Sequence, residues 1–356
     1  MKKIVLYINT LGHGGAERVI SNLATQFSES GYECILATSC RDAWEYSYGD
    51  KVRRSILYDE PIKKNFLIKN IMLVISLRKL IKKEKPDVLV SFMAEPNFRA
   101  ILASFWLKTK VIISVRNDPN REYPSTLYKI LAKILYRFSD CIVFQTEDAK
   151  RWFPKVIQKK SKIILNQVDK VFYDINFEGE KRDIITVGRL TSQKNHKFLI
   201  KAFSLIKDEV TDNLVIYGEG ELRGELEQLI QDLDLEDRVF LPGTIKNVEN
   251  AVKRAKLFVL SSEYEGLPNS LMEAMALGTP SISTDCPCGG PRMLFDDEKN
   301  GILCEAGNTY ELAKKIRMIC NNDVVRKKLG ENAKERAKFF APEVVFINWK
   351  ETIDDV

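Results

Sequence analysis

Two glutamates eight residues apart, Glu265 and Glu273, stand where their carboxylates could bind the hydroxyl groups of a sugar. The apolar run at residues 257–260 predicts a buried strand, which places Glu265 just beyond the strand's carboxyl end. Residues 271–277 are good helix formers, so Glu273 falls within the first turns of the following helix. A buried strand–helix unit without a ligand also explains the pattern, because a spacing of eight is common by chance.

The start of this helix is a candidate anion site. Pro268 suits the first helical position, and Gly278 followed by Pro280 ends the helix. The backbone N–H groups around Asn269 and Ser270 are then available to a phosphate. The two carboxylates would hold sugar hydroxyls on either side of that phosphate without binding the phosphate itself.

The complete stretch at residues 261–280, SSEYEGLPNSLMEAMALGTP, resembles the E-x7-E segment of the family 4 glycosyltransferases, which have the GT-B fold. The resemblance implies that Glu265 reaches the transferred sugar, that Glu273 holds the ribose, and that the helix start binds the diphosphate. The donor-binding residues that it implies in this stretch are Glu265, Gly266, Leu267, Asn269, Ser270 and Glu273.

Length and composition predict a folded protein of two domains. At 356 residues the chain is long for one hydrophobic core, and 45% hydrophobic with 29% charged residues is ordinary for a globular protein. No apolar run reaches membrane-spanning length, and the opening MKKIVLY predicts a first strand rather than a signal peptide. The seven scattered cysteines fit reduced thiols in a cytosol. Cys286 and Cys288 lack metal-site spacing, so we expect no metal.

Charge is distributed unevenly between the two halves of the sequence. Residues 1–165 contain 29 Lys and Arg against 16 Asp and Glu, a net of +13. Residues 166–356 contain 26 against 33, a net of −7. The asymmetry favours an anionic partner for the first half, and nucleic acid, a membrane surface and a phosphorylated acceptor all fit.

Apolar runs alternate with helical patterns along the whole chain, which predicts an α/β fold with parallel sheets. The expected strands are at residues 3–9, 34–39, 88–93, 111–115, 141–145, 162–168, 183–188, 213–217, 238–241, 257–260, 281–284 and 301–304. The family resemblance is strong at residues 183–301 and weak at residues 41–85.

A glycine turn with Gly14 and Gly15 separates the first expected strand from a helix that extends to about residue 30. A strand, a glycine turn and a helix form the arrangement that binds phosphates, although a tight turn without a ligand has the same pattern. The resemblance implies that these glycine amides approach the donor diphosphate and the acceptor.

The strand at residues 111–115 continues into Arg116, Asn117 and Asp118. Much of the family has a histidine near this position, lining the reaction centre, and here Arg116 takes its place. This departure argues against a histidine-dependent step. Arg116 is therefore a candidate catalytic residue that could meet an acceptor phosphate, and Asn117 or Asp118 could meet a sugar hydroxyl on the acceptor side.

Two cations, Arg189 and Lys194, follow the strand at residues 183–188. A pair at this spacing can bind a diphosphate leaving group, and two ordinary surface cations are the alternative. The family carries the same pair, which implies a catalytic role for both residues. A later loop contains Ile245 and Asn247, and the resemblance implies that its backbone contacts the nucleotide base.

Two stretches of the first half, residues 66–85 and 125–138, combine basic and apolar residues at helical spacing. In the second stretch Lys129, Lys133 and Arg137 recur every four residues beside aliphatic residues. Lysines on one face and aliphatics on the other match a helix on a membrane surface, and a solvated basic face fits as well. The net charge of the first half favours the membrane.

The resemblance extends over nearly the whole chain and implies two Rossmann-like domains facing a central cleft. Residues 1–168 would bind the acceptor, residues 169–182 would be a linker, and residues 183–340 would bind the nucleotide sugar. Residues 341–356 would form a tail helix that crosses back to the first domain.

The implied activity is retaining transfer of a sugar from a nucleotide-diphospho sugar, with UDP the carrier expected from family frequency. Arg189, Lys194 and the helix start would carry the charge of the leaving diphosphate without a metal or other cofactor. Glu265 would position the sugar, and it is the carboxylate nominated as a nucleophile, although front-face attack is the favoured family account.

The expected acceptor is an anionic lipid-linked glycan or a polysaccharide, met on the inner face of a bacterial cytoplasmic membrane, with no role for nucleic acid. Two other classes remain open. One is another GT-B enzyme, such as a sugar-nucleotide epimerase or a phosphorylase, although the lysine-bound cofactor site of a phosphorylase is not evident. The other is a non-catalytic nucleotide-sugar binder, which the arginine at position 116 motivates.

Overall fold

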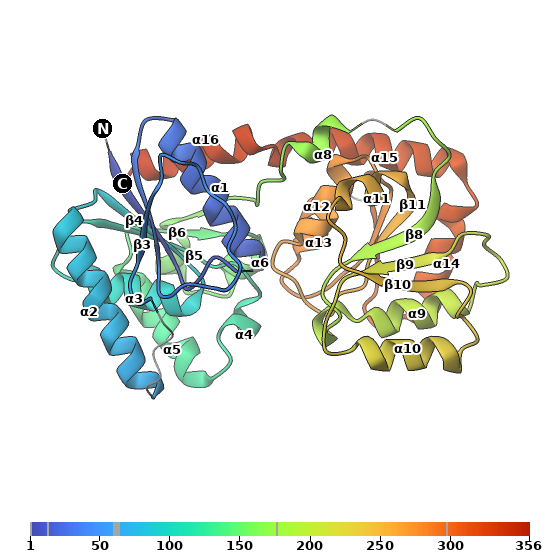
Figure 1. Ribbon diagram of the computed structural model, residues 1–356, viewed down its shortest axis with the longest axis horizontal. Coiled ribbons are helices and arrows are strands. Elements are labelled where there is room, and N and C mark those ends of the chain that lie inside the picture. The colour runs from blue at the N-terminus through green and yellow to red at the C-terminus, as the bar shows by residue number, and fades with distance from the viewer. Residues whose placement is uncertain (1, 13, 60–64, 176, 297) are drawn as a thin grey trace. The chain divides into compact units, whose positions relative to one another are not determined.

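The computed structural model describes residues 2–12, 14–59, 65–175, 177–296 and 298–356. The chain divides into two compact units (Figure 1). Unit 1 contains Met1–Asn166 and Val345–Val356, and unit 2 contains Gln167–Val344. The chain therefore passes from unit 1 to unit 2 and returns in its last helix.

Unit 1 is built on seven parallel strands in the order β3-β2-β1-β4-β5-β6-β7. The strands are β1 Lys3–Ile8, β2 Glu33–Thr38, β3 Arg53–Ile56, β4 Val88–Phe92, β5 Lys110–Ser114, β6 Cys141–Phe144 and β7 Ser161–Ile163. The sequence did not predict β3, whose residues Arg-Arg-Ser-Ile lack an apolar run. As an edge strand it needs none, and its Arg53 pairs instead with Glu33 and Glu84.

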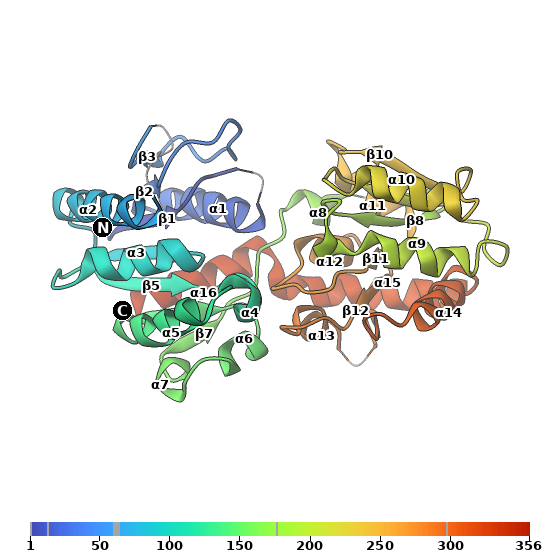
Figure 2. The ribbon, with the colours of Figure 1, turned by 90° about the horizontal axis from the view of Figure 1, so that it is seen from below.

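The helices of unit 1 cover both faces of its sheet. They are α1 Gly15–Glu29, α2 Phe66–Glu84, α3 Ala94–Ser104, α4 Pro119–Glu122, α5 Thr126–Leu135, α6 Glu147–Arg151, α7 Lys155–Gln158 and α16 Pro342–Asp354. Helices α2, α3 and α5 pack side by side on one face, and α1 and α16 lie on the other (Figures 1 and 2). Trp349 of α16 is fully buried and stacks on Phe92, with ring centroids 5.5 Å apart.

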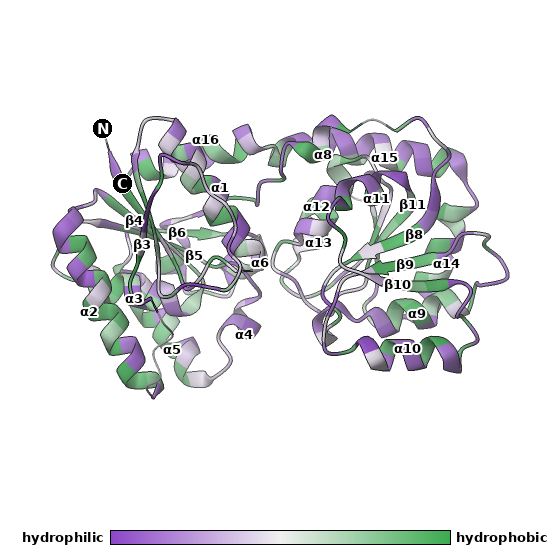
Figure 3. Ribbon diagram, in the orientation of Figure 1, coloured by the Kyte–Doolittle hydropathy of each residue, from purple (hydrophilic) through white to green (hydrophobic). Residues whose placement is uncertain are grey.

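Unit 2 contains six parallel strands in the order β10-β9-β8-β11-β12-β13. They are β8 Arg182–Val187, β9 Leu214–Tyr217, β10 Val239–Gly243, β11 Ala255–Leu260, β12 Ser281–Thr284 and β13 Ile302–Cys304. All six coincide with expected strands. Their buried apolar residues, green in Figure 3, explain why the sequence predicted these strands.

Helices also cover both faces of the second sheet. They are α8 Val171–Asp174, α9 His196–Ser204, α10 Arg223–Asp232, α11 Val248–Arg254, α12 Asn269–Ala276, α13 Gly290–Leu294, α14 Thr309–Cys320 and α15 Asp323–Ala337. Helices α9, α10 and α14 enclose the main apolar core, whereas α11, α12 and α15 lie on the opposite face (Figure 1). The expected linker at residues 169–182 is not wholly irregular, because α8 forms one helical turn around the buried Phe172.

Helix α12 begins one residue later than predicted. Pro268 has φ −76° and ψ 106°, so it precedes the helix instead of occupying its first position. The end is as predicted: Gly278 adopts φ +68°, and the N–H groups of Gly278 and Thr279 donate to the carbonyls of Met275 and Ala274.

Both sheets have the doubly wound order in which the strand sequence reverses beside the first strand. The reversal falls between β1 and β4 in unit 1, and between β8 and β11 in unit 2. Ligands of such sheets bind at the carboxyl ends of the strands at this point. The predicted α/β class with two Rossmann-like domains is therefore confirmed.

Candidate active site

In unit 2 the strand reversal brings Lys194, from the loop after β8, to Glu265, from the loop after β11. Lys194 Nζ lies 2.6 Å from Glu265 Oε1, and the hydroxyl of Ser262 donates to the same oxygen at 2.7 Å. The Lys194 and Glu265 side chains are only 16% and 9% exposed. The two residues that were predicted to meet the leaving diphosphate and the transferred sugar thus form one ion pair.

Further hydrogen bonds hold the two loops together. Ser261 Oγ donates to the carbonyl of Lys194 at 2.8 Å, and the N–H of Glu263 donates to the carbonyl of Gln193 at 2.8 Å. The Gln193 side-chain amide donates to the carbonyl of Tyr264 at 3.1 Å. The position of the ion pair is therefore determined by backbone contacts as well as by the side chains themselves.

The start of α12 lies directly after this loop. Pro268, the residue before the helix, makes no side-chain capping hydrogen bond, and the helix start around Asn269 and Ser270 stays a candidate anion site. Glu273 is 6% exposed in the first turns of the helix. A β-carbon on Gly290 would lie 1.9 Å from the carbonyl oxygen of Gly266, so only glycine permits this approach of the next loop to the site.

Arg189 differs from Lys194 in its surroundings. Its side chain is exposed and makes no ion pair with the residues that the structure describes. His196, the first residue of α9, is buried near Lys194. Burial and the Lys194 charge lower the pKa of His196 to about 4, so this imidazole is neutral at pH 7.

Ile245 and Asn247 lie in a different part of unit 2. They follow β10, which is two strands from β8, a separation of roughly 10 Å. Both line a cavity of about 770 Å³ whose wall also contains Tyr217 and Phe177. This wall includes neither the Lys194–Glu265 pair nor Arg189, so the structure does not collect all the predicted donor residues in one cavity.

In unit 1, Gly14 and Gly15 lie where the sequence predicted, after β1 at the carboxyl edge of the sheet. Gly14 precedes α1 with extended backbone, and its N–H donates to the carbonyl of Gly12 at 2.8 Å. Gly15 begins this helix of 15 residues. The turn is thus a helix start that can approach an anion.

Arg116 follows β5, but its side chain is turned inward. Its guanidinium carbon lies 4.4 Å from the ring centroid of Phe92, and it donates to Asn166 and, at 3.4 Å, to Ser114. Burial lowers the pKa of Arg116 to about 9. A direct contact between Arg116 and an acceptor stays a prediction, because the side chain is only 7% exposed. Asn117 is half-buried beside it.

Glu122, at the end of α4, was missed by the sequence reasoning. Its Oε2 accepts hydrogen bonds from the N–H groups of Arg116 and Asn117 at 3.2 and 3.0 Å. Burial raises the pKa of this carboxyl to about 7. Asp118 and Pro119 together signal a short helix start, and that turn is what brings Glu122 back to the β5 loop.

Helices α2 and α5 expose apolar residues, and we call this surface the apolar stripe. Its members on α5 are Leu127, Ile130 and Ile134, and its members on α2 are Phe66, Leu67, Ile68, Ile71 and Ile75, each 44% to 68% exposed. Phe66 contacts Tyr128, which places the starts of the two helices side by side. Of the basic residues that the sequence placed on one face of this stretch, Lys129 and Lys133 are half-buried and Arg137 is exposed, and Lys133 lies 4.3 Å from the Trp152 ring centroid. No helix of the described chain is long and apolar enough to span a membrane.

The two doubly wound units, and the charged residues in the loops after β8 and β11, define a class of protein: an enzyme of the GT-B fold. Residues 13–171 match the model of glycosyltransferase family 4, and residues 168–336 match that of group 1 glycosyl transferases. The chain belongs to this family of glycosyltransferases.

Two relatives from Campylobacter jejuni align over almost their whole length. One is GalNAc-alpha-(1->4)-GalNAc-alpha-(1->3)-diNAcBac-PP-undecaprenol alpha-1,4-N-acetyl-D-galactosaminyltransferase, 30% identical over 100% of this chain and 99% of its own. The other is N-acetylgalactosamine-N,N'-diacetylbacillosaminyl-diphospho-undecaprenol 4-alpha-N-acetylgalactosaminyltransferase, 31% identical over 96% of each.

Solved structures show the same fold. Sucrose-phosphate synthase from Thermosynechococcus elongatus has a TM-score of 0.86 at 18% identity, covering 100% of this chain and 99% of its own. HepE of Anabaena in complex with UDP has a TM-score of 0.85 at 18% identity, covering 100% of both chains.

Proposed function

We propose that this glycosyltransferase moves a sugar, with retention of configuration, from a UDP-linked donor to a hydroxyl of a lipid-linked or polysaccharide acceptor in bacterial surface glycan synthesis. The observation that carries the proposal is the Lys194–Glu265 pair beside the uncapped start of α12. A cation, a carboxylate and the start of a helix then lie at one edge of the sheet, where a phosphate and a sugar need opposite partners.

The chemistry that this arrangement supports is stabilisation of a leaving diphosphate by fixed charges. Arg189 and Lys194 would supply two cations, and the first turn of α12 would supply backbone N–H donors. Glu265 would orient the sugar at the reacting carbon. In this proposal the step proceeds without a metal or other cofactor, because protein groups meet the negative charge that develops on the diphosphate.

The acceptor proposal comes from the relatives and from charge. The two Campylobacter enzymes carry diphospho-undecaprenol acceptors in their names, and HepE was solved with UDP. Residues 1–165 have a net charge of +13, which would favour an acceptor that bears phosphates.

Peripheral contact with the inner face of the cytoplasmic membrane is the second part of the proposal. The apolar stripe supports it, since two adjacent helices expose eight large apolar residues. Lys79, Lys82 and Lys83 continue α2 as exposed cations that could meet anionic headgroups.

A donor and acceptor assay tests the catalytic proposal. The protein is incubated with UDP-sugars labelled in the sugar, together with a bacterial membrane extract. Label that moves into extracted lipid or polysaccharide supports the proposal. Label that stays in the nucleotide fraction, unchanged or epimerised, with every UDP-sugar offered, overturns it.

A vesicle-binding assay tests the membrane proposal separately. Wild-type protein should sediment with vesicles that contain anionic lipid, and less so as salt rises. Ile130→Gln/Ile134→Gln should weaken binding by at least about tenfold, since two exposed apolar side chains lose their burial. The control Leu205→Gln/Val324→Gln changes two exposed apolar residues of unit 2 and should bind like wild type. Equal binding by both variants contradicts docking through the apolar stripe.

A further inference from the structure

A second cavity of unit 2, of about 600 Å³, lies at the amino-terminal edge of the sheet, opposite the edge that carries the Lys194–Glu265 pair. Its wall combines the residues before β8, the start of β11, the turn after α12 and one side of α15. The volume is in the range of small-molecule sites in proteins.

This cavity concentrates positive charge. Six cationic side chains line it, against the three carboxylates of Glu180, Asp323 and Glu331. The cations are Lys181, Lys253, Lys256, Arg326, Lys327 and Lys334. Unit 2, residues 167–344, contains 25 Lys and Arg against 30 Asp and Glu, a net charge of −5, so the cavity is opposite in sign to the unit that contains it.

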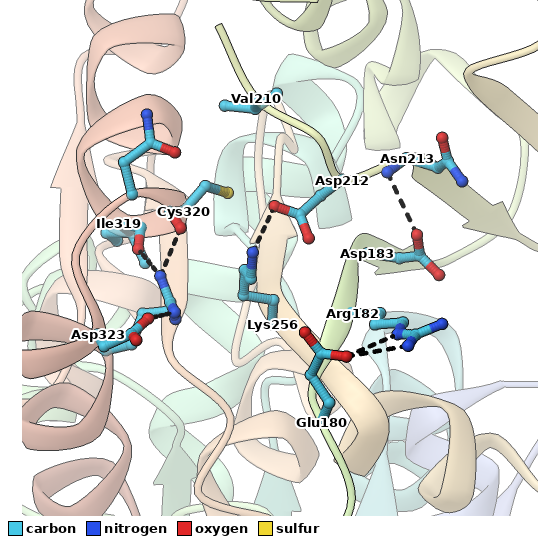
Figure 4. Close-up of polar contacts among 12 residues, drawn as sticks. Glu180, Arg182, Asp183, Val210, Asp212, Asn213, Lys256, Ile319, Cys320 and Asp323 are labelled. Atoms are coloured by element: carbon cyan, nitrogen blue, oxygen red, sulfur yellow. Dashed lines mark hydrogen bonds and ion pairs between the residues drawn. The ribbon is translucent and has the colours of Figure 1, made fainter.

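Two of the six cavity cations are paired with carboxylates. Lys256 pairs with Asp212 at 2.7 Å, as Figure 4 shows, and Arg326 pairs with Asp323 on α15. Glu180 pairs with Arg182, outside the cavity wall, at 2.9 Å. Among the lining carboxylates that the structure describes, Glu331 then remains for the other four cations.

Four cavity cations, Lys181, Lys253, Lys327 and Lys334, make no ion pair with any residue that the structure describes. Lys181 is half-buried, and burial together with the charges of Lys253 and Arg326 lowers the pKa of its ammonium to about 8. Lys253 donates to the carbonyl of Leu277 at 2.7 Å, a neutral partner. Like charges gathered at a half-buried position repel one another, and a bound anion would relieve the repulsion.

The walls of the cavity are fixed by close backbone packing. A β-carbon on Gly330 of α15 would lie 2.5 Å from the carbonyl oxygen of Gly278, at the end of α12. This approach holds α15 against the turn after α12 and sets the distance between Lys334 and the lysines across the cavity. The cations are therefore carried by four segments in a defined arrangement, unlike a row on a single solvated helix.

We propose that this cavity is a binding site for a small soluble ligand with two or more phosphate groups, distinct from the donor site. Phosphate oxygens accept charge-assisted hydrogen bonds from several lysines at once, and a ligand with more than one phosphate matches cations spread over opposite walls. The site does not depend on the proposed glycosyl transfer, because it shares no residue with the Lys194–Glu265 loops.

Calorimetric titration of the full chain with inorganic tripolyphosphate tests the site. Lys181→Gln/Lys334→Gln should bind at least about tenfold more weakly than wild type, which is about 1.4 kcal/mol. The matched control Lys201→Gln/Lys314→Gln removes two exposed lysines on the other face of the sheet and should bind like wild type. Arg189→Ala, in the donor loop, should keep the cavity binding. If the cavity variant binds as tightly as the matched control, or Arg189→Ala alone abolishes binding, the proposal is wrong.

Two further readouts fix the ligand class and the residue. At pH 8, binding should draw a proton onto Lys181, so the wild-type enthalpy should vary with the ionisation enthalpy of the buffer. Lys334→Gln, at an exposed position, should keep this dependence while binding more weakly. Equal affinity for citrate overturns the assignment to phosphate. Binding to phosphatidylglycerol vesicles without binding to tripolyphosphate overturns the assignment to a soluble ligand.

Discussion

Replacing Lys194 by alanine should damage stability and turnover together, because the residue neutralises a buried carboxylate. The ammonium lies 2.6 Å from Glu265, whose side chain is 9% exposed. After the substitution, the hydroxyl of Ser262 still donates a hydrogen bond to the paired oxygen at 2.7 Å. The variant therefore leaves a desolvated charge with one neutral hydrogen-bond donor.

The size of the effect follows from that geometry. Breaking one side of a buried ion pair costs about 3–5 kcal/mol, and the 16% exposure of Lys194 favours the lower end, about 3 kcal/mol. Lys194→Ala/Glu265→Gln removes both charges and should recover at least about 1.5 kcal/mol of that loss. Glu265→Gln alone should cost less than Lys194→Ala, because the remaining ammonium is 16% exposed and can reach water more easily than the 9% exposed carboxylate can.

Urea unfolding of wild type, the two single variants and the double variant, followed by circular dichroism, measures this double-mutant cycle. A free energy of unfolding within about 0.5 kcal/mol of wild type would refute the reasoning, since the pair would then not exist in the ligand-free protein. Turnover of the folded variant should fall about a hundredfold.

Four further predictions probe other parts of the chain. Arg189→Ala should also lower turnover by about a hundredfold, but should leave urea stability within about 0.5 kcal/mol, because its side chain is exposed. Turnover should survive EDTA, measured as sugar transfer; loss that magnesium or manganese restores would reveal a metal-dependent step. Glu122 has a raised pKa of about 7, so the folded state binds the extra proton below pH 7 and its stability falls as pH rises from about 4.5 to 7. Between pH 5 and pH 8 the free energy of unfolding of wild type should therefore fall by about 1–3 kcal/mol relative to that of Glu122→Gln. The same pH dependence in both proteins, measured by urea unfolding, would contradict this. Trp349→Ala should cost about 3–5 kcal/mol in urea unfolding, because the indole is fully buried against Phe92; a loss below about 1 kcal/mol would show that α16 does not pack as described.

The sequence predicted the strands because buried parallel strands leave a simple signature. Twelve expected strands overlap β1, β2 and β4–β13, although the one expected at residues 162–168 shares only Lys162 and Ile163 with β7. The edge strand β3 escaped because it pairs along one side and needs no apolar residues. The start of α12 was misplaced at Pro268, whose ring fixes φ but leaves ψ to the surrounding loop.

The candidate site was predictable where it depends on chain-local spacing, and less so where it depends on side-chain direction. Glu265 and Lys194 could be paired in outline, because the loops after β8 and β11 adjoin at the strand reversal. The inward turn of Arg116 toward Asn166 could not, since it depends on contacts 50 positions apart. The aliphatic face of α5 was predicted from its spacing, whereas the contact of Lys133 with the Trp152 ring was not, because the two residues come from different helices.

The return of α16 to unit 1 constrains how this enzyme can be recombined with its relatives. A chimera that exchanges everything after Asn166 would import a foreign last helix, although Val345–Val356 belong to the first unit. The incoming helix would have to fill the space of Trp349 beneath Phe92. Exchanging only residues 167 to 344, between the two points where the chain passes from one unit to the other, keeps that core intact. The exchangeable module is thus an internal segment, and unit 1 keeps Val345–Val356 together with the residues up to Asn166.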